Sequence, residues 1–482
     1  MKYIKRIISI FVFLTILASL LYYINGVLLI KRNDGITPMQ NFYVQEENTI
    51  DVLLLGSSHT GMNLDTEVLW NEYGISSYAL WGSMQPFWNT YYFLMEALKT
   101  QTPKVIILDV YAATFDFEYS DEARQLTNVG GMNLSLNKWN AIKASAPRER
   151  WFDLLTGFPL YHSRYNEITQ DDFQHFPWSE NLIDNKGTSY RYGIAENFSL
   201  ENASLITERK PILEKEETYL LKIIQLSREK NIPLVLVTTP TVSRIDEQPY
   251  YNYIQDIAER YDVEYYNFNL MDSETGFNSN DFWTDGSHIN TNGSRKITSY
   301  LGNLLQMKYE VPDHRGEAEY ISWKKNAVNI QNGYLQSITN VLDYFEELKR
   351  NDRTVLLIKN SSWEPSETCQ TLLENMEKIG IDIQEVNESG GGVWLLSSTY
   401  GGIFENKYEG GMYSEFSFDN SIFSVDFQNG TGVCINGKKV YNLNGPGVIC
   451  IIYDTNTAKC VDVVSFLQAN NFSLEHNLSM IQ

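Results

Sequence analysis

Short apolar runs alternate with helical patterns between residues 48 and 307. The apolar runs, which predict buried strands, lie at 52–55, 77–80, 105–110, 234–238 and 263–268. Helical spacing falls between them, for example at 88–98 and at 213–230, and a last helix is expected at about 291–307. Buried strands that alternate with helices are typical of a parallel sheet covered on both faces. We predict a three-layer α/β domain with five parallel strands over residues 33–310.

The stretch from about 113 to 211 interrupts this alternation. It holds no long periodic segment and is rich in Trp, Tyr, Phe, Asn and Asp. A structureless loop of this size is uncommon inside a compact domain. We interpret it as an insertion after the third strand. Two roles stay open: a lid or wall of a substrate site, or a structural excursion that packs on the sheet without touching substrate.

A second pattern begins after residue 310. A polar stretch opens an expected linker at 311–334, and helices are predicted at 335–349 and 366–379 around a strand at 355–359. The rest is β-rich, with strands expected at 393–397, 422–427, 432–440, 448–453 and 461–466. Asn436-Gly437 is typical of a tight hairpin turn. We predict a separate α+β domain over residues 335–482.

The N-terminus carries a targeting signal. Lys2, Lys5 and Arg6 precede an apolar stretch at 7–30 that is long enough to cross a bilayer as a helix. It is longer than the core of a signal peptide and lacks a small-x-small cleavage site. Lys31 and Arg32 follow it and weaken the charge bias that would set its orientation. We predict a cytoplasmic tip and single-pass anchor at 1–32 with the rest of the chain outside the cell; the alternative is a cleaved signal peptide.

Charge and cysteine usage exclude several functions. The chain of 482 residues has a formal net charge of −22, which disfavours nucleic acid as a partner. Its cysteines are Cys369, Cys434, Cys450 and Cys460, and none forms a C-x-x-C pair. The six histidines are scattered as well, so we predict neither a metal nor another cofactor. An outside location would permit disulfides, and buried thiols are the equal alternative.

Two short motifs supply a complete catalytic set. Gly-Ser-Ser-His at 56–59 ends the first strand, and Asp-Gly-Ser-His at 285–288 precedes the closing helix. Open α/β sheets bind ligands at the carboxyl ends of their strands. Ser58 is a candidate nucleophile, His288 a candidate base that takes its proton, and Asp285 can orient the imidazole. Each motif taken alone could also have a purely structural role; for example, Ser57 or Ser58 could cap a helix.

The two motifs resemble blocks of the SGNH (GDSL-like) hydrolase superfamily. Its nucleophile lies in a Gly-Asp-Ser-type first block and its last block reads Asp-x-x-His. The resemblance covers about residues 48–307 and implies a flavodoxin-like fold with Ser58, Asp285 and His288 as a triad. The Gly-Ser-Ser variant is similar to the membrane-anchored branch of the D-alanyl transfer proteins. Gly-Asp-Ser-His versions resemble alginate and peptidoglycan O-acetyltransferases.

The resemblance also implies an oxyanion hole. The superfamily uses the N–H of the nucleophile, a Gly and an Asn as donors. Gly82 follows the second expected strand and fits the Gly position, beside the N–H of Ser58. The expected Gly-x-Asn is missing after the third strand, where residues 108–112 read Leu-Asp-Val-Tyr-Ala. His59 either lines the site or belongs to a turn, and the turn is our interpretation.

The C-terminal part resembles the interleukin-like EMT inducer (PANDER-like) domain. The similar stretches are 341–357 with 393–394, and 435–466. In that family the hairpin half comes first, whereas here it comes last, as a circular permutation would produce. The resemblance implies binding of a carbohydrate or a partner, not catalysis. A purely structural β-rich appendage is the alternative.

These patterns lead to one functional expectation. We expect an extracytoplasmic serine esterase or O-acyltransferase acting on acyl esters, in the first place acetyl esters, of a cell-surface polysaccharide or wall polymer. An acyl-serine intermediate would form on Ser58. By analogy with the alginate and D-alanyl systems, a transferase would need a polytopic membrane acyltransferase as the partner that supplies acyl groups. The alternative is a non-catalytic carbohydrate-binding or assembly protein on a degenerate SGNH scaffold.

Overall fold

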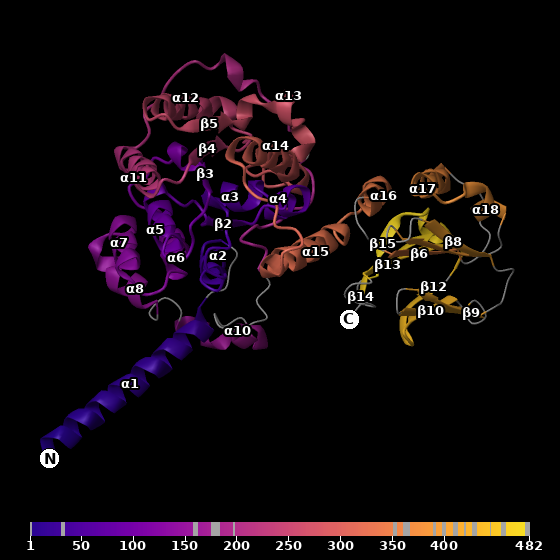
Figure 1. Ribbon diagram of the computed structural model, residues 1–482, viewed down its shortest axis with the longest axis horizontal. Helices are drawn as coiled ribbons and strands as arrows, with labels where there is room; N and C mark the ends of the chain where they lie inside the picture. The colour runs from indigo at the N-terminus through magenta and orange to yellow at the C-terminus, as the bar shows by residue number, and fades with distance from the viewer. Residues whose placement is uncertain are drawn as a thin grey trace. The chain divides into compact units, whose positions relative to one another are not determined.

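The computed structural model divides the chain into two compact units, Met1–Val328 and Asn329–Gln482 (Figure 1). It describes residues 2–29, 34–157, 162–174, 184–195, 198–349, 354–359, 367–388, 392–397, 402–407, 413–418, 421–426, 431–443, 445–454 and 459–477.

A five-stranded parallel sheet forms the centre of the first unit. Across the sheet the strands are β2 (Ser77–Trp81), β1 (Val52–Gly56), β3 (Val105–Asp109), β4 (Leu234–Thr238) and β5 (Glu264–Asn267). Every residue of β1, β2, β3 and β4 is buried. Burial on both faces explains why these strands read as continuous apolar runs. The five predicted strands are confirmed.

Helices cover both faces of this sheet. Leu53 and Leu55 of β1 join one apolar cluster with residues of α5 (Phe87–Ala97), α11 (Glu214–Lys230) and α12 (Arg244–Arg260). Val52 and Leu54 join a second cluster with α4 (Thr66–Tyr73) and α14 (Thr291–Tyr309). Alternate residues of a strand point to opposite faces, so the two clusters define a helix layer on each side. The predicted α/β class is confirmed.

The region expected to be an insertion contains more helix than its sequence indicated. It includes α6 (Glu122–Gly130), α7 (Leu136–Ser145), α8 (Trp151–Thr156) and α10 (Gln170–Gln174). Ala141 and Ile142 of α7 lie in the same cluster as α5. These helices have five to ten residues, too short for their periodicity to stand out in the sequence.

The expected linker at 311–334 is mostly ordered structure that packs on the first unit. His314 Nε2 lies 2.7 Å from Asp51 Oδ2, and the ring of His314 stacks on Tyr320. Helix α15 (Ile321–Leu335) follows, and its Trp323 donates a hydrogen bond to the Ser77 carbonyl. The border between the units therefore falls inside α15. The polar sequence of 311–319 indicated an exposed linker. In the folded protein, however, its charged side chains form hydrogen bonds with other residues.

The second unit contains two antiparallel sheets. One has the order β15-β14-β13-β6-β7-β8 and the other β12-β11-β10-β9. The strands are β6 (Thr354–Lys359), β7 (Gly392–Ser397), β8 (Gly402–Lys407), β9 (Tyr413–Phe418), β10 (Ser421–Asp426), β11 (Thr431–Ile435), β12 (Lys438–Leu443), β13 (Gly447–Asp454), β14 (Lys459–Leu467) and β15 (Leu474–His476). Leu356 and Ile358 join a cluster with residues of β10 and β11. Leu357 on the opposite face packs with α16 (Val341–Lys349) and α17 (Glu367–Lys378).

Most sequence predictions for this unit are confirmed, with two corrections. The strand expected at 432–440 is two strands, because Asn436 and Gly437 turn a hairpin between β11 and β12 with φ angles of 51° and 77°. The expected helix at 335–349 is interrupted, because α15 ends at Leu335 and α16 begins at Val341. The Asn340 side chain accepts a hydrogen bond from the Asp343 N–H, which starts α16 anew. A last short helix, α18, spans Ile383–Glu388.

All four cysteines are thiols rather than disulfides. Cys369 and Cys450 are buried, and Cys434 and Cys460 are partly buried. Burial raises the pKa of Cys460 to about 12 and raises the pKa of Cys450 still further. These two groups stay protonated near neutral pH and are poor nucleophiles.

Helix α1 (Lys2–Leu28) is long and apolar enough to span a membrane. The candidate span is Tyr3–Leu28, with a mean hydropathy of 2.5 and none of its apolar window buried. A signal sequence meets the same criteria of length and composition. Lys31 and Arg32, on which the charge argument rests, lie outside the described residues.

A partly buried histidine makes the stability of the second unit depend on pH. His476 Nδ1 lies 3.0 Å from Asp462 Oδ2, and its Nε2 lies 2.7 Å from the Ile338 carbonyl oxygen. Both nitrogens can donate only when the imidazole is protonated. Burial lowers the pKa of His476, but these acceptors outweigh that effect and the net pKa is raised.

We expect the second unit to lose stability as the pH rises. The unfolded chain has a histidine pKa of about 6.5, so the stabilisation is complete below that pH and disappears as the pH passes the higher folded-state pKa. Hydrogen exchange of β14 amides in the full chain, corrected for intrinsic rates, should show faster opening between pH 6.5 and 9. His476→Gln should remove this pH dependence; the same dependence in both proteins would contradict the assignment.

Candidate functional site

A sharp turn after β1 places Ser58 at the carboxyl edge of the sheet. Gly56 ends the strand with φ of 143°, and a Cβ there would collide with Thr60 Oγ1 and lie 2.9 Å from the Asp109 carbonyl oxygen. Helix α3 (Ser58–Asn63) follows at once, and Ser57 caps it by accepting a hydrogen bond from the His59 N–H. The two serines therefore differ: Ser57 caps the helix, and Ser58 is left for other contacts.

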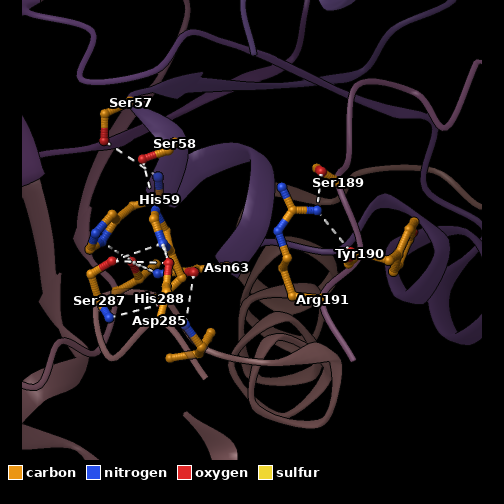
Figure 2. A network of polar contacts seen from close by, with 12 residues as sticks. Ser57, Ser58, His59, Asn63, Ser189, Tyr190, Arg191, Asp285, Ser287 and His288 are labelled. Carbon is orange, nitrogen blue, oxygen red and sulfur yellow. Dashed lines mark hydrogen bonds and ion pairs between the residues drawn. The ribbon is translucent and has the colours of Figure 1, made fainter. Parts of the chain in front are cut away.

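Ser58, His288 and Asp285 form one hydrogen-bonded chain. Ser58 Oγ lies 2.9 Å from His288 Nε2, and His288 Nδ1 lies 2.6 Å from Asp285 Oδ2 (Figure 2). A carboxylate cannot donate, so Nδ1 carries the proton and Nε2 accepts from the serine hydroxyl. The side chains of His288 and Asp285 are 14% and 30% exposed, so a substrate can reach them. The structure thus brings together the three residues proposed from the motifs.

The loop that carries His288 and Asp285 is fixed by its backbone. Phe282 and Ile289 pair across its base, and the Trp283 N–H donates to the His288 carbonyl. Asp285 Oδ1 accepts from the N–H groups of Ser287 and His288, each at 3.0 Å. Oδ2 is left to face the imidazole. One carboxylate therefore shapes the turn and orients the histidine.

Asn63 links this loop to the helix of the nucleophile. Its Oδ1 accepts from the Ile289 N–H at 3.2 Å, one residue after His288 (Figure 2). Its Nδ2 donates to Thr239 Oγ1 at 2.9 Å. Sequence reasoning missed Asn63 because nothing local marks it. It follows Ser58 by little more than one turn of α3, which places it beside the later loop.

Hydrogen bonding keeps Asp285 ionised. Burial alone would raise the pKa of Asp285, but the bonds from His288 and from the Ser287 and His288 N–H groups outweigh it and hold the pKa well below its usual value. An ionised carboxylate attracts the positive charge that His288 acquires when it takes a proton.

His59 lies inside the site, not in a turn as the sequence suggested. Its ring stacks on Tyr111, with centroids 3.7 Å apart, and lies 5.0 Å from the ring of His288. His59 Nδ1 is 3.3 Å from Thr239 Oγ1. Burial, with a further contribution from His288, lowers the pKa of His59 well below its usual value. The second imidazole of the site is therefore neutral.

Asp109 at the end of β3 completes this inner network. Its Oδ2 lies 3.2 Å from both the N–H and the Oγ1 of Thr239, and its Oδ1 accepts from the Tyr111 N–H. Burial raises the pKa of Asp109 to about 7, although these hydrogen bonds act in the opposite direction. Thr239 thus connects Asp109, His59 and Asn63 behind the triad.

Gly82 directly follows β2, whose Trp81 pairs with Gly56 at the end of β1. A Cβ on Gly82 would collide with Asn128 Oδ1 and lie 2.7 Å from Gln85 Oε1, so only glycine fits. After β3 the chain continues with Val110 and Tyr111, and the Asn expected there is missing. The amide side chains of Asn128, in α6, and of Gln85 both lie against Gly82, and the sequence singled out neither.

The end of the long insertion packs against the loop that carries His288 and Asp285. The Thr291 N–H donates to the Arg191 carbonyl, Asn290 Nδ2 to the Gly193 carbonyl, and the Ala195 N–H to the Phe282 carbonyl. The Phe198 ring covers Gly286, where a Cβ would lie 2.8 Å from it. This part of the insertion therefore packs on the site, and its contact with a substrate stays a prediction.

The described residues contain no group of three or more His, Cys, Asp or Glu side chains suited to hold a metal ion. The sequence matches no family model and no curated protein. The functional argument therefore depends on the geometry of the site.

We predict that Thr239→Val destabilises the first unit by about 1–3 kcal/mol. The buried Asn63 amide loses its acceptor and the buried Asp109 carboxyl loses a donor, and such groups are costly to leave unpaired. Denaturant unfolding measures the change. Thr102→Val is the matched control, because its hydroxyl bonds Asn48 at an exposed position. Equal stability of the two variants would show that Thr239 does not hold the network.

Proposed function

We propose that the chain is an extracytoplasmic serine esterase or O-acyltransferase of the SGNH type. The single observation that supports this most is the hydrogen-bonded chain from Ser58 through His288 to Asp285. Its position gives further support. In a sheet of order 2-1-3-4-5 the direction of winding switches between β1 and β3, and ligands of such flavodoxin-like sheets bind at that point.

The proposed reaction begins when His288 Nε2 takes the proton of Ser58 Oγ. The oxygen attacks the acyl carbonyl and the ester's C–O bond breaks, while His288 returns the proton to the leaving alcohol. An acyl-serine remains. His288 then deprotonates either water or a sugar hydroxyl, whose oxygen attacks the acyl carbon. The bond between that carbon and Ser58 Oγ breaks, and His288 gives the proton back to Ser58 Oγ. Access of the acceptor decides between esterase and transferase.

The N–H groups of Ser58 and Gly82 are the proposed donors for the oxyanion. The N–H of the first residue in a helix has no partner within the helix, and Gly82 lies on the neighbouring strand end. One lost donor in such a site costs about 10²–10³ in rate. A site without the Asn block is therefore expected to be slower unless another amide replaces it.

The apolar helix α1 and the second unit suggest where the protein acts and on what kind of substrate. We propose that α1 anchors the protein at the cell membrane, with both units outside, and that the substrate is a cell-surface polysaccharide or wall polymer. Acyl groups would come from a polytopic membrane acyltransferase. The second unit, with its resemblance to the interleukin-like EMT inducer domain, would bind glycan or a partner.

One observation favours the alternative of a non-catalytic assembly protein. Tyr111, not an Asn, follows β3, and its ring is stacked on His59. An inert scaffold would have no need to keep the hydrogen bonds of Ser58, His288 and Asp285, so catalysis is the better account of the site.

We predict that Ser58→Ala abolishes covalent labelling by a fluorophosphonate probe. The reagent needs an activated hydroxyl, and the hydroxyl of Ser58 bonds His288 Nε2. Ser57→Ala is the matched control: it removes a neighbouring hydroxyl that only caps α3, and labelling should persist. In-gel fluorescence measures both. Labelling of Ser58→Ala at the wild-type level would disprove the nucleophile assignment.

We predict that Asp285→Asn lowers the turnover of an acetyl ester by about 10⁴ with the fold intact, because Asn cannot hold the imidazole in the required tautomer or stabilise its charge. Release of p-nitrophenol from p-nitrophenyl acetate gives the rate, and circular dichroism reports folding. Asn can still accept the two N–H bonds of the turn. A loss below tenfold would mean that Asp285 only shapes the loop.

A further inference from the structure

Arg191 is a partly buried cation with no carboxylate partner among the described residues. Arg150, Arg164, Arg244 and Arg295 have side chains 1–21% exposed, and each has a carboxylate oxygen within 3.6 Å. Arg191 is likewise partly buried, but in the described part of the chain no carboxylate oxygen lies within 4 Å of its guanidinium. A cation withdrawn from water costs free energy unless an anion compensates it.

One edge of this guanidinium has no hydrogen-bond partner among the described residues. Nη1 donates to Ser189 Oγ at 2.8 Å and to the Tyr190 carbonyl at 3.0 Å (Figure 2). Nε is buried and has no hydrogen-bond partner. Nη2 has none either among the described residues. Nε and Nη2 lie on the same side of the planar group, which is the side that binds an oxyanion with two parallel hydrogen bonds.

The backbone fixes Arg191 beside the catalytic loop. Its carbonyl accepts from both the N–H and the Oγ1 of Thr291, three residues after His288. Its guanidinium lies 5.1 Å from the ring centroid of Trp283, whose N–H donates to the His288 carbonyl. Burial lowers the pKa of Arg191 and the nearby carboxylate of Asp285 acts against that effect.

We propose that Arg191 binds an anionic group of the polymer, a carboxylate or a phosphodiester, next to the acyl group that Ser58 attacks. The partly exposed Trp283 ring would support the adjoining sugar. This inference rests on the proposed function and adds the substrate class: an acidic glycan. In a chain with a net charge of −22, a cation at this position gives an acidic polymer a defined orientation at the site.

The test measures binding without turnover. Full-length Ser58→Ala protein in detergent is titrated calorimetrically with a galacturonate oligomer, a glycerol-phosphate oligomer and a neutral galactan oligomer. At least one anionic oligomer should bind, and added salt should weaken it. Arg191→Gln should weaken that binding about 10–100-fold. This is the loss in affinity expected when hydrogen bonds to a charged group are removed. Binding of the neutral oligomer should be the same in both proteins.

Arg191→Lys and fluorophosphonate labelling separate the alternatives. Lys keeps the charge and loses the two-pronged geometry, so it should recover only part of the affinity. Equal binding by Arg191→Gln and its parent, or no preference for either anionic oligomer, would overturn the subsite. The anionic oligomer that responds identifies the group. Labelling of Ser58 in the wild type tests the proposed function separately, and its failure there would refute that function rather than the subsite.

Discussion

The hydrogen bond between Ser58 and His288 joins residues 230 positions apart, and the rest of the site depends on how the fold brings them together. β1 lies second in the sheet, so the turn after it is supported by neighbours on both sides. The loop of His288 follows β5 at the far edge and needs a separate attachment to reach Ser58. Asn63 provides it, since its amide bonds Ile289 on one side and Thr239 on the other.

The charges of the site are arranged so that a single positive charge can form. Asp285 stays ionised and faces one nitrogen of His288. His59, a ring only 5.0 Å away, stays neutral because it is buried. A protonated His59 would repel the imidazolium that the proposed reaction forms at His288. The burial of His59 behind Tyr111 and Thr239 therefore favours the proton transfer that we propose.

The sheet and the triad could be predicted from the sequence because both rest on local signals. Apolar runs mark strands buried on two faces, and each motif of the triad is contiguous and lies at a strand end or a helix start. Asn63, Thr239 and Arg191 could not be predicted, because each acquires its role from residues far away in the sequence. The helical content of 113–211 and the packing of 311–320 were missed for a related reason. Short helices and polar segments have weak periodicity, and their stability comes from the surfaces they cover.

The central claim is that Ser58 becomes acylated during turnover. The direct measurement is peptide mass spectrometry after rapid acid quenching of the full-length protein with an acetyl ester. The peptide that contains Ser58 should gain the mass of one acetyl group, located on that residue by fragmentation, and the gain should be absent in Ser58→Ala. Turnover with no acylated Ser58, or with the acetyl group on another residue, would contradict the account.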